Sequence, residues 1–81
     1  MPMDEVLAEI RRVARDELGL SRAVRDGDDL VADLQLDSVA LLTLVVGLED
    51  KFRIALKEED AAAVRTVREL AALVEERRKQ C

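Results

Sequence analysis

The sequence predicts an all-α protein: a small four-helix bundle of three main helices and one short helix, with a long loop between the first two helices. Three observations support this prediction. Apolar residues recur at helical spacing in several segments, the single proline stands at position 2, and no segment favours a sheet. A chain of 81 residues has room for one compact domain, so we expect a single domain over 1–81.

The first helix is expected over 4–18. Its apolar residues follow i, i+3, i+4, i+7 spacing, which places them on one face, while the arginines near its end lie largely on the solvent side. Asp4 is a candidate N-cap, because its carboxylate can accept a hydrogen bond from a backbone N–H of the first turn. Gly19 occupies the place where a left-handed residue would end this helix.

The segment 21–35 has no sustained hydrophobic period and contains the turn signal Asp26-Gly27-Asp28. Leu30, Val31 and Leu34 are expected to anchor it to the core. A loop of this length is long for so small a domain, and such loops are often functional.

Residues 38–52 form the most apolar part of the chain, and a buried strand or a central helix could both explain them. Fifteen residues without a turn signal, rich in Leu, favour a helix packed on several sides. Asp37 or Ser38 can supply the N-cap oxygen. Gly47 costs up to about 1 kcal/mol inside a helix, so we expect it to permit close approach of a neighbouring helix.

Two further helices complete the prediction. Residues 58–64 are expected to form a short helix with acids at its positive end, a solvated helix start rather than a general acid/base pair. Thr66 and Glu69 have the spacing of a capping box at the start of the last helix. Glu75 and Lys79 are spaced for an i, i+4 ion pair near its end. The expected core face of the last helix comprises Val67, Leu70, Ala71, Leu73 and Val74.

The composition excludes several functions. There is no His, which removes Ser-His-Asp and Cys-His triads and imidazole metal ligands, so we expect no catalytic residues and no metal site. Thirteen basic residues against eighteen acidic ones leave a net charge of −5, which argues against nucleic acid and favours basic partners. Cys81 is the only cysteine, expected to be an exposed thiol on the tail. With neither a signal-peptide core nor about 20 consecutive apolar residues, the protein is expected to be soluble and cytoplasmic.

One local constellation could support chemistry. Residues 33–39 read Asp-Leu-Gln-Leu-Asp-Ser-Val and place the Ser38 hydroxyl between an acid and an apolar residue, after a loop and at a helix start. Unpaired backbone N–H groups at a helix start favour a phosphate. The same geometry describes any serine N-cap, so the residues alone leave a structural role and a functional role open.

At these residues the sequence resembles the acyl carrier protein family, and the resemblance covers nearly the whole chain. The family pattern Asp-Leu-Gly-x-Asp-Ser-Leu corresponds to 33–39. The apolar helix that follows it, ending in acids and Phe, corresponds to Leu42, Leu44, Val45, Leu48, Glu49, Asp50 and Phe52. The later acidic loop and Thr-Val helix start correspond to 54–60 and to Thr66-Val67.

Three departures from the family pattern are informative. Gln35 replaces the usual Gly, so we expect an ordinary backbone conformation there rather than a positive φ. Val39 replaces Leu, a modest loss of volume beside the serine. Ala40, Leu41 and Thr43 occupy a stretch where the family usually carries acids, so docking should rely more on apolar contact. Leu41 is expected to be either extra core or an exposed partner contact.

The resemblance implies that Ser38 Oγ is the attachment point for 4′-phosphopantetheine, transferred from coenzyme A by a separate Mg²⁺-dependent transferase. The thiol of this group would hold an acyl intermediate as a thioester, so the protein would be a carrier and not an enzyme. The resemblance also implies a partner-binding surface. In this surface Leu42 and Val46 would flank the prosthetic arm. The acids Glu49 and Asp50, together with residues 58–60, would meet basic residues of the partner. The expected members of this surface are Asp37, Val39, Leu41, Leu42, Val46, Glu49 and Asp50.

The implied partners are a phosphopantetheinyl transferase and the acyl-transferring or acyl-activating synthases and ligases of fatty-acid, lipid or polyketide biosynthesis. A monomer is implied as well. Three alternatives stay open: an aminoacyl or peptidyl carrier, an unmodified interaction module of the same fold, and an unrelated helical bundle in which Ser38 only caps a helix.

Overall fold

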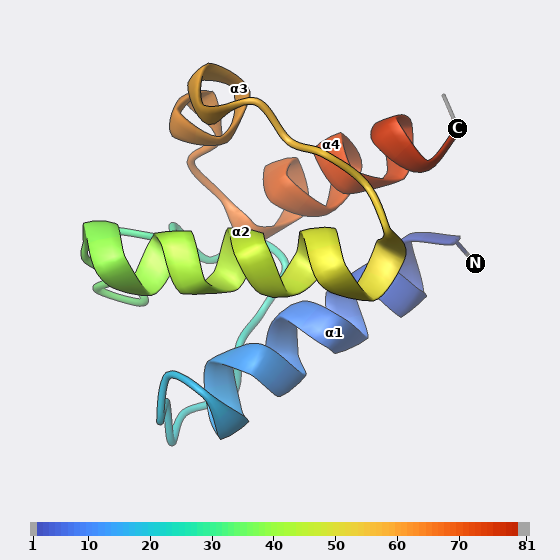
Figure 1. Cartoon of the computed structure of the whole chain (residues 1–81). Coiled ribbons are helices and arrows are strands. Elements are labelled where there is room, and N and C mark those ends of the chain that lie inside the picture. Colours follow the sequence, from blue (N-terminus) through green and yellow to red (C-terminus); the bar gives the residue numbers. More distant parts are fainter. Residues whose placement is uncertain (1, 80–81) are drawn as a thin grey trace.

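The computed structural model describes residues 2–79 and shows four helices around one core (Figure 1). These are α1 (Pro2–Asp16), α2 (Ser38–Phe52), α3 (Glu58–Ala63) and α4 (Val67–Lys79). Within that range no strand forms, and the one β-type pairing is an isolated bridge between Asp29 and Thr66. The prediction of a small all-α bundle with a long first loop is therefore confirmed. The Cα radius of gyration is 11.4 Å, close to the ~12 Å of a single domain of this length.

The helix boundaries follow the predictions closely, with one correction. The α2 bounds agree with the expected 38–52, which excludes the strand interpretation. The N-cap assigned to Asp4 is wrong, because α1 already begins at Pro2 and Asp4 lies in its first turn. Proline is tolerated there, since the first turn leaves its N–H groups unpaired anyway. At the other end Gly19 has φ +71°, the expected left-handed conformation.

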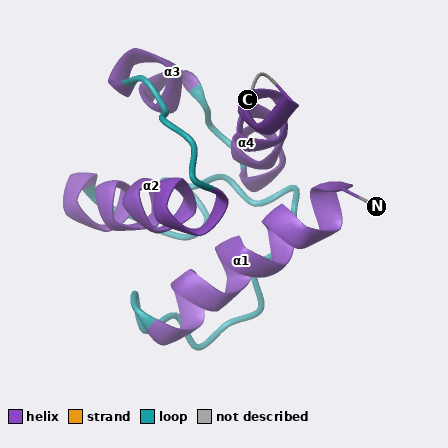
Figure 2. Cartoon of the chain, turned by 45° about the vertical axis from the view of Figure 1, so that its right-hand side comes forward, coloured by secondary structure: helices purple, strands orange, loops and turns teal. Residues whose placement is uncertain are grey.

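The core lies where α1 meets α2 and α4 (Figure 2). Its fully buried large side chains come from these three helices and from the first loop: Val6, Ile10, Val13, Leu30, Leu44, Leu48, Val67, Leu70 and Val74. Burial of each such side chain stabilises the fold by about 1.5–3 kcal/mol. A Cβ added at Gly47 would lie 3.4 Å from Val13 Cγ2. The expected close approach of helices at Gly47 is thus confirmed, between α1 and α2.

The long first loop is fastened to the core, although one expected anchor is wrong. Leu30 and Leu34 are buried, whereas Val31 is 64% exposed. The Asp29 carboxylate accepts hydrogen bonds from the backbone N–H groups of Val31 and Ala32, at 2.9 and 2.7 Å. This turn directs the leucines on either side inward and Val31 outward. Sequence reasoning missed the buried Val24 and Leu36, whose isolated positions carry no periodic signal.

Backbone hydrogen bonds join this loop to the start of α4. The Leu30 N–H donates to Arg65 O at 2.7 Å, and the Val67 N–H donates to Asp28 O at 3.0 Å. The predicted capping box is confirmed, since Glu69 N–H donates to Thr66 Oγ1 at 3.1 Å and Thr66 N–H donates to Glu69 Oε1 at 3.0 Å. These bonds fasten the middle of the loop to the start of α4.

Ion pairs hold the remaining elements in place. Asp60 of α3 pairs with Arg77 of α4, which ties the short helix to the bundle. Near the end of α4, Glu75 pairs with Arg78 at 3.3 Å. The Arg78 guanidinium also lies 4.7 Å from the centroid of the Phe52 ring, a cation–π contact that links α4 to the end of α2. Of the predicted core face of α4, only Leu73 is half-buried rather than buried.

Candidate functional site

Ser38 is the first residue of α2 and is exposed to solvent. Asp37, with extended backbone at φ −84° and ψ −178°, is the N-cap: its Oδ1 accepts a hydrogen bond from Ala40 N–H at 2.7 Å. This resolves the choice between Asp37 and Ser38 as the cap. The Ser38 hydroxyl makes no hydrogen bond with any residue in the described range 2–79. The Ser38 side chain is therefore accessible from solvent.

The backbone before Ser38 differs from the prediction. Gln35 has φ +56°, so the expectation of an ordinary conformation is wrong. Its neighbours Leu34 and Leu36 are both buried, with 3% and 7% exposure, and Leu36 N–H donates to Leu30 O at 3.0 Å. The chain must turn sharply between two buried leucines, and a left-handed residue makes that turn. For a residue other than Gly this conformation costs roughly 1–2 kcal/mol, which the burial of the two leucines outweighs.

Ser38 lies at the edge of a groove between α2 and α3, with a volume of about 520 Å³. Most of its lining is apolar, and two carboxylates complete it: Leu41, Leu42, Val45, Leu56, Ala61, Ala62, Glu49 and Glu58. Leu41 is half-buried, packs against the core and also lines the groove. The core interpretation of Leu41 is therefore partly confirmed, while a partner contact at Leu41 stays a prediction. This α2–α3 groove places an apolar surface directly beside the candidate attachment atom.

A second groove of about 580 Å³ runs along the other side of α2, between α2 and α1. Its α2 wall carries Val39, Leu42 and Val46, which are 72%, 61% and 45% exposed. Their i, i+3, i+7 spacing places them in one stripe, which we call the apolar stripe. They are three of the four large apolar residues that are exposed within the described chain. Such a row beside Ser38 is typical of a surface that another protein covers.

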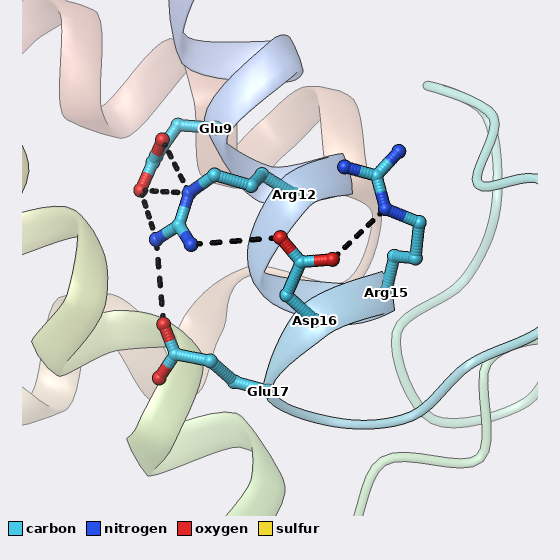
Figure 3. A network of polar contacts seen from close by, with 5 residues as sticks. All are labelled: Glu9, Arg12, Arg15, Asp16 and Glu17. Carbon is cyan, nitrogen blue, oxygen red and sulfur yellow. Dashed lines mark hydrogen bonds and ion pairs between the residues drawn. The ribbon is translucent and has the colours of Figure 1, made fainter.

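The α1 wall of this groove is charged and internally paired (Figure 3). Arg12 contacts Glu9 at 2.7 Å, Glu17 at 3.3 Å and Asp16 at 3.8 Å. The hydrogen bond from Arg12 lowers the pKa of Glu9, and that from Arg15 lowers the pKa of Asp16. Sequence reasoning missed this wall, although the i, i+3 and i, i+4 spacing of Glu9, Arg12 and Asp16 signals such pairs.

The acids predicted to meet partners differ in their availability. Asp50 is exposed and lines the α1–α2 groove. Glu49 is half-buried, and its Oε2 accepts a hydrogen bond from Leu56 N–H at 2.8 Å, which fixes the segment leading to α3. Asp60 is engaged with Arg77, whereas Glu58 is exposed. The partner-binding roles of these acids stay predictions, with Asp50 and Glu58 the most accessible.

Among the described residues, no group of three or more His, Cys, Asp or Glu side chains is arranged to hold a metal ion. No helix in the part of the chain that the structure describes is long and apolar enough to cross a membrane. Cys81, predicted to be an exposed thiol, lies outside the described residues.

Comparison with known proteins places the chain in a family. The family described as phosphopantetheine attachment site matches residues 8–74. The acyl carrier protein of Kocuria rhizophila is 30% identical over 73 residues, covering 89% of this chain and 90% of the relative. That of Myxococcus xanthus is 33% identical over 67 residues, covering 82% and 85%. The crystal structure of an acyl carrier protein from Thermotoga maritima superposes with a TM-score of 0.87, covering 99% and 94% at 22% identity, which supports the fold.

The chain therefore belongs to the acyl carrier protein family. Members of this family are carriers and not enzymes, and they bear a covalent 4′-phosphopantetheine group. The group supplies the reactive thiol, while the protein supplies an attachment atom and a docking surface. The residues present fit this group, because an exposed, unbonded hydroxyl begins a helix whose first turn has unpaired N–H groups.

Proposed function

We propose that this protein is an acyl carrier of one domain over 1–81, with 4′-phosphopantetheine attached to Ser38 Oγ. The observation that carries the proposal is the exposed Ser38 hydroxyl, which Asp37 leaves free by taking over the capping of α2. Attachment would form a P–O bond to Ser38 Oγ and break the pyrophosphate bond of coenzyme A, releasing adenosine 3′,5′-bisphosphate, while the transferase accepts the hydroxyl proton. The start of α2 would stabilise the phosphodiester, because the positive end of a helix dipole favours negative charge.

The surfaces on either side of Ser38 have different tasks in this proposal. The apolar stripe contacts the transferase and the acyl-transferring or acyl-activating partners, with Asp50 adding charge steering at its end. The α2–α3 groove receives the arm or its cargo, because Ser38 opens onto it and its lining is mostly apolar. We propose that the protein acts as a cytoplasmic monomer in fatty-acid, lipid or polyketide biosynthesis.

One observation favours a second candidate, an aminoacyl carrier. The α2–α3 groove is lined by the carboxylates of Glu49 and Glu58, and its lining includes no Lys or Arg. A cargo that bears an ammonium group would be attracted there, whereas a carboxylate-bearing cargo would be repelled. The test loads the protein with butanoyl-, β-alanyl- and succinyl-coenzyme A derivatives in competition and follows the Leu56 and Ala61 amides by NMR. A shift of these signals with the β-alanyl cargo supports the aminoacyl carrier, and a shift with the butanoyl cargo supports the acyl carrier.

The decisive experiment is intact mass after incubation with coenzyme A, Mg²⁺ and a broad-specificity transferase. The proposal expects a gain of about 340 Da that disappears in Ser38→Ala, because attachment requires that hydroxyl. The matched control is Ser21→Ala, which removes an exposed loop hydroxyl and leaves the gain unchanged. No gain with several transferases would instead support the unmodified interaction module.

A further inference from the structure

The segment from Arg11 to Arg25 has the opposite charge to the protein as a whole. It contains five arginines against the two acids Asp16 and Glu17, a net charge of +3 in a chain of −5. It lies in the second half of α1 and the beginning of the first loop, and none of its arginines except Arg12 lines a groove beside α2. The segment 11–25 is therefore positively charged, although the protein as a whole is negatively charged.

Three of these arginines line a hollow of about 360 Å³ between α1 and the loop. We call Arg11, Arg15 and Arg22 the arginine cradle; Leu20, Ser21, Ala23 and Val24 complete the lining. Arg11 and Arg15 are spaced i, i+4 and so lie on one side of the helix. Figure 3 shows Arg15 at the edge of the Arg12 network, where its Nε is joined to the Asp16 carboxylate that Arg12 also contacts.

Two members of the arginine cradle are held in place. The Arg11 Nε–H donates to Val24 O at 2.9 Å, which joins the helix to the loop. The Arg22 guanidinium donates to Asp33 O at 3.1 Å and to Asp28 Oδ2 at 3.3 Å. Each guanidinium has five N–H donors, so these bonds orient Arg11 and Arg22 and leave further donors available. A preorganised donor set reduces the entropy cost of binding.

The cradle retains positive charge after its internal pairs are counted. Arg15 pairs with Asp16 at 3.0 Å, but Asp16 is shared with Arg12, and the Arg15 side chain is 72% exposed. Asp28 is shared between Arg22 and the backbone N–H of Arg25. Three arginines against these two acids leave a net charge of +1, and all three arginines are exposed residues. An anionic group is the complementary ligand.

The residues that line the hollow indicate which kind of ligand carries that anionic group: a free phosphate, a lipid or a protein segment. Leu20 is half-buried and Val24 is buried, so the hollow has an apolar floor beside its guanidiniums. A bare phosphate would leave this floor unused. The exposed large apolar residues of the described chain all lie outside the cradle, which therefore has no anchor for a lipid surface. A protein segment with carboxylates beside an apolar side chain satisfies both parts of the lining.

We propose that the arginine cradle is a second docking surface, which binds an acidic segment of a partner protein that carries at least two carboxylates beside an apolar side chain. This surface requires neither Ser38 nor the prosthetic arm, so it goes beyond the carrier function and is independent of it. A partner could then hold the carrier through α1 and the loop while α2 and its Ser38 stay accessible to another enzyme.

The test is a titration of the full ¹⁵N-labelled protein with the capped peptide Glu-Glu-Leu-Ala-Glu-Glu, followed by NMR. We expect saturable shifts of the amides of residues 20–24, and none with the matched peptide Gln-Gln-Leu-Ala-Gln-Gln. The Arg15→Gln variant should bind the acidic peptide about threefold more weakly, as removal of an exposed ion pair does. Charge reversal in Arg15→Glu should weaken binding about tenfold, because it adds repulsion. The control Arg65→Gln removes an equally charged arginine outside the cradle, 81% exposed, and should leave binding unchanged.

Several outcomes would overturn the proposal. These are absence of shifts at residues 20–24 up to about 10 mM peptide, equal weakening by Arg65→Gln, and stronger response to inorganic phosphate or to phosphatidylglycerol vesicles than to the acidic peptide. Self-association of the protein that Arg15→Glu abolishes would contradict a separate partner and indicate a second copy of this chain. Mass gain at Ser38 should be the same in Arg15→Gln and wild type, so failure of the cradle and failure of the carrier function are told apart.

Discussion

The outward sides of α1 and α2 both face solvent, but they are built from different residues. On α1, most exposed positions are charged, and Arg12 pairs with three carboxylates of its own helix and the turn that follows it. On α2, the apolar stripe of Val39, Leu42 and Val46 is exposed without any such partner. An exposed apolar row adds little to the stability of the free protein, because its side chains are not buried. The charges on α1, in contrast, already have ion-pair partners within the protein.

The difference between the two surfaces indicates that α2, rather than this side of α1, is suited to contact partner proteins. Exposed apolar residues gain free energy only when another surface covers them, so the α2 stripe is suited to transient partners. In the α1 network, hydrogen bonds from Arg12 and Arg15 lower the pKa of Glu9 and of Asp16, so these charges are already paired within the free protein. The arginine cradle between α1 and the first loop is where positive charge exceeds negative charge. The following predictions test this comparison.

The largest expected effect separates the buried and exposed sides of α2. Leu48→Ala should lower the free energy of unfolding by about 2–5 kcal/mol, because Leu48 is fully buried and its truncation leaves a cavity. The same change in the apolar stripe, Leu42→Ala, should alter stability by less than about 0.5 kcal/mol, since Leu42 is 61% exposed. Urea unfolding measures both. Equal losses would show that the stripe is part of the core and would remove the contrast between the helices.

Loss of the α2 cap is the next largest effect. Asp37→Ala should destabilise the protein by about 1 kcal/mol, because Ala40 N–H loses its side-chain acceptor. Asp37→Asn keeps an acceptor and removes the charge, so it should preserve most of the stability in urea. If Asn costs as much as Ala, the carboxylate charge rather than the hydrogen bond stabilises the start of α2. The transferase rate of the two variants then reports whether that charge guides docking.

Glycine at position 35 should relieve the backbone strain in the turn before Ser38. Gln35→Gly removes a left-handed cost of roughly 1–2 kcal/mol, while the greater freedom of the unfolded chain offsets about 0.4–1 kcal/mol of it. A net gain of about 0.5–1 kcal/mol in unfolding free energy is therefore expected. Gln35→Ala is the control and should change little, because alanine bears the same conformational cost. A loss of stability in Gln35→Gly would mean that the Gln side chain makes a stabilising interaction in solution.

The smallest expected effect is a loss of folding stability at low pH. Hydrogen bonds from Arg65 N–H and Thr66 N–H lower the pKa of Glu69, and those from Ala32 and Val31 lower the pKa of Asp29. A lowered folded-state pKa gives stability that is complete above the ordinary values, 4.5 for Glu and 3.8 for Asp, and that is lost as the pH falls below them. The urea midpoint should fall between pH 6 and pH 3. The fall should be smaller in Glu69→Gln, and an unchanged fall would rule out this cap as a contributor.

Much of the fold and of the candidate site could be predicted because the signals are local. The bounds of α2, the capping box of Thr66 and Glu69, and the exposed place of Ser38 follow from hydrophobic period and from capping chemistry. Two of the wrong predictions have a shared reason. The conformation of Gln35 and the exposure of Val31 depend on how neighbouring segments pack, and residue type alone does not reveal this. The Asp4 cap was wrong for a local reason, because α1 already begins at Pro2.

By itself, the sequence determined the helical class, the serine at a helix start and an acidic surface without catalytic residues, because these depend on periodicity and residue chemistry. Only the tertiary structure decided which acids are available, since Glu49 is bound to Leu56 and Asp60 to Arg77. It alone imposed the left-handed turn at Gln35, because two leucines separated by one residue must both reach the core. It also gathered Arg11, Arg15 and Arg22 around one hollow, a nonlocal arrangement that net charge cannot express.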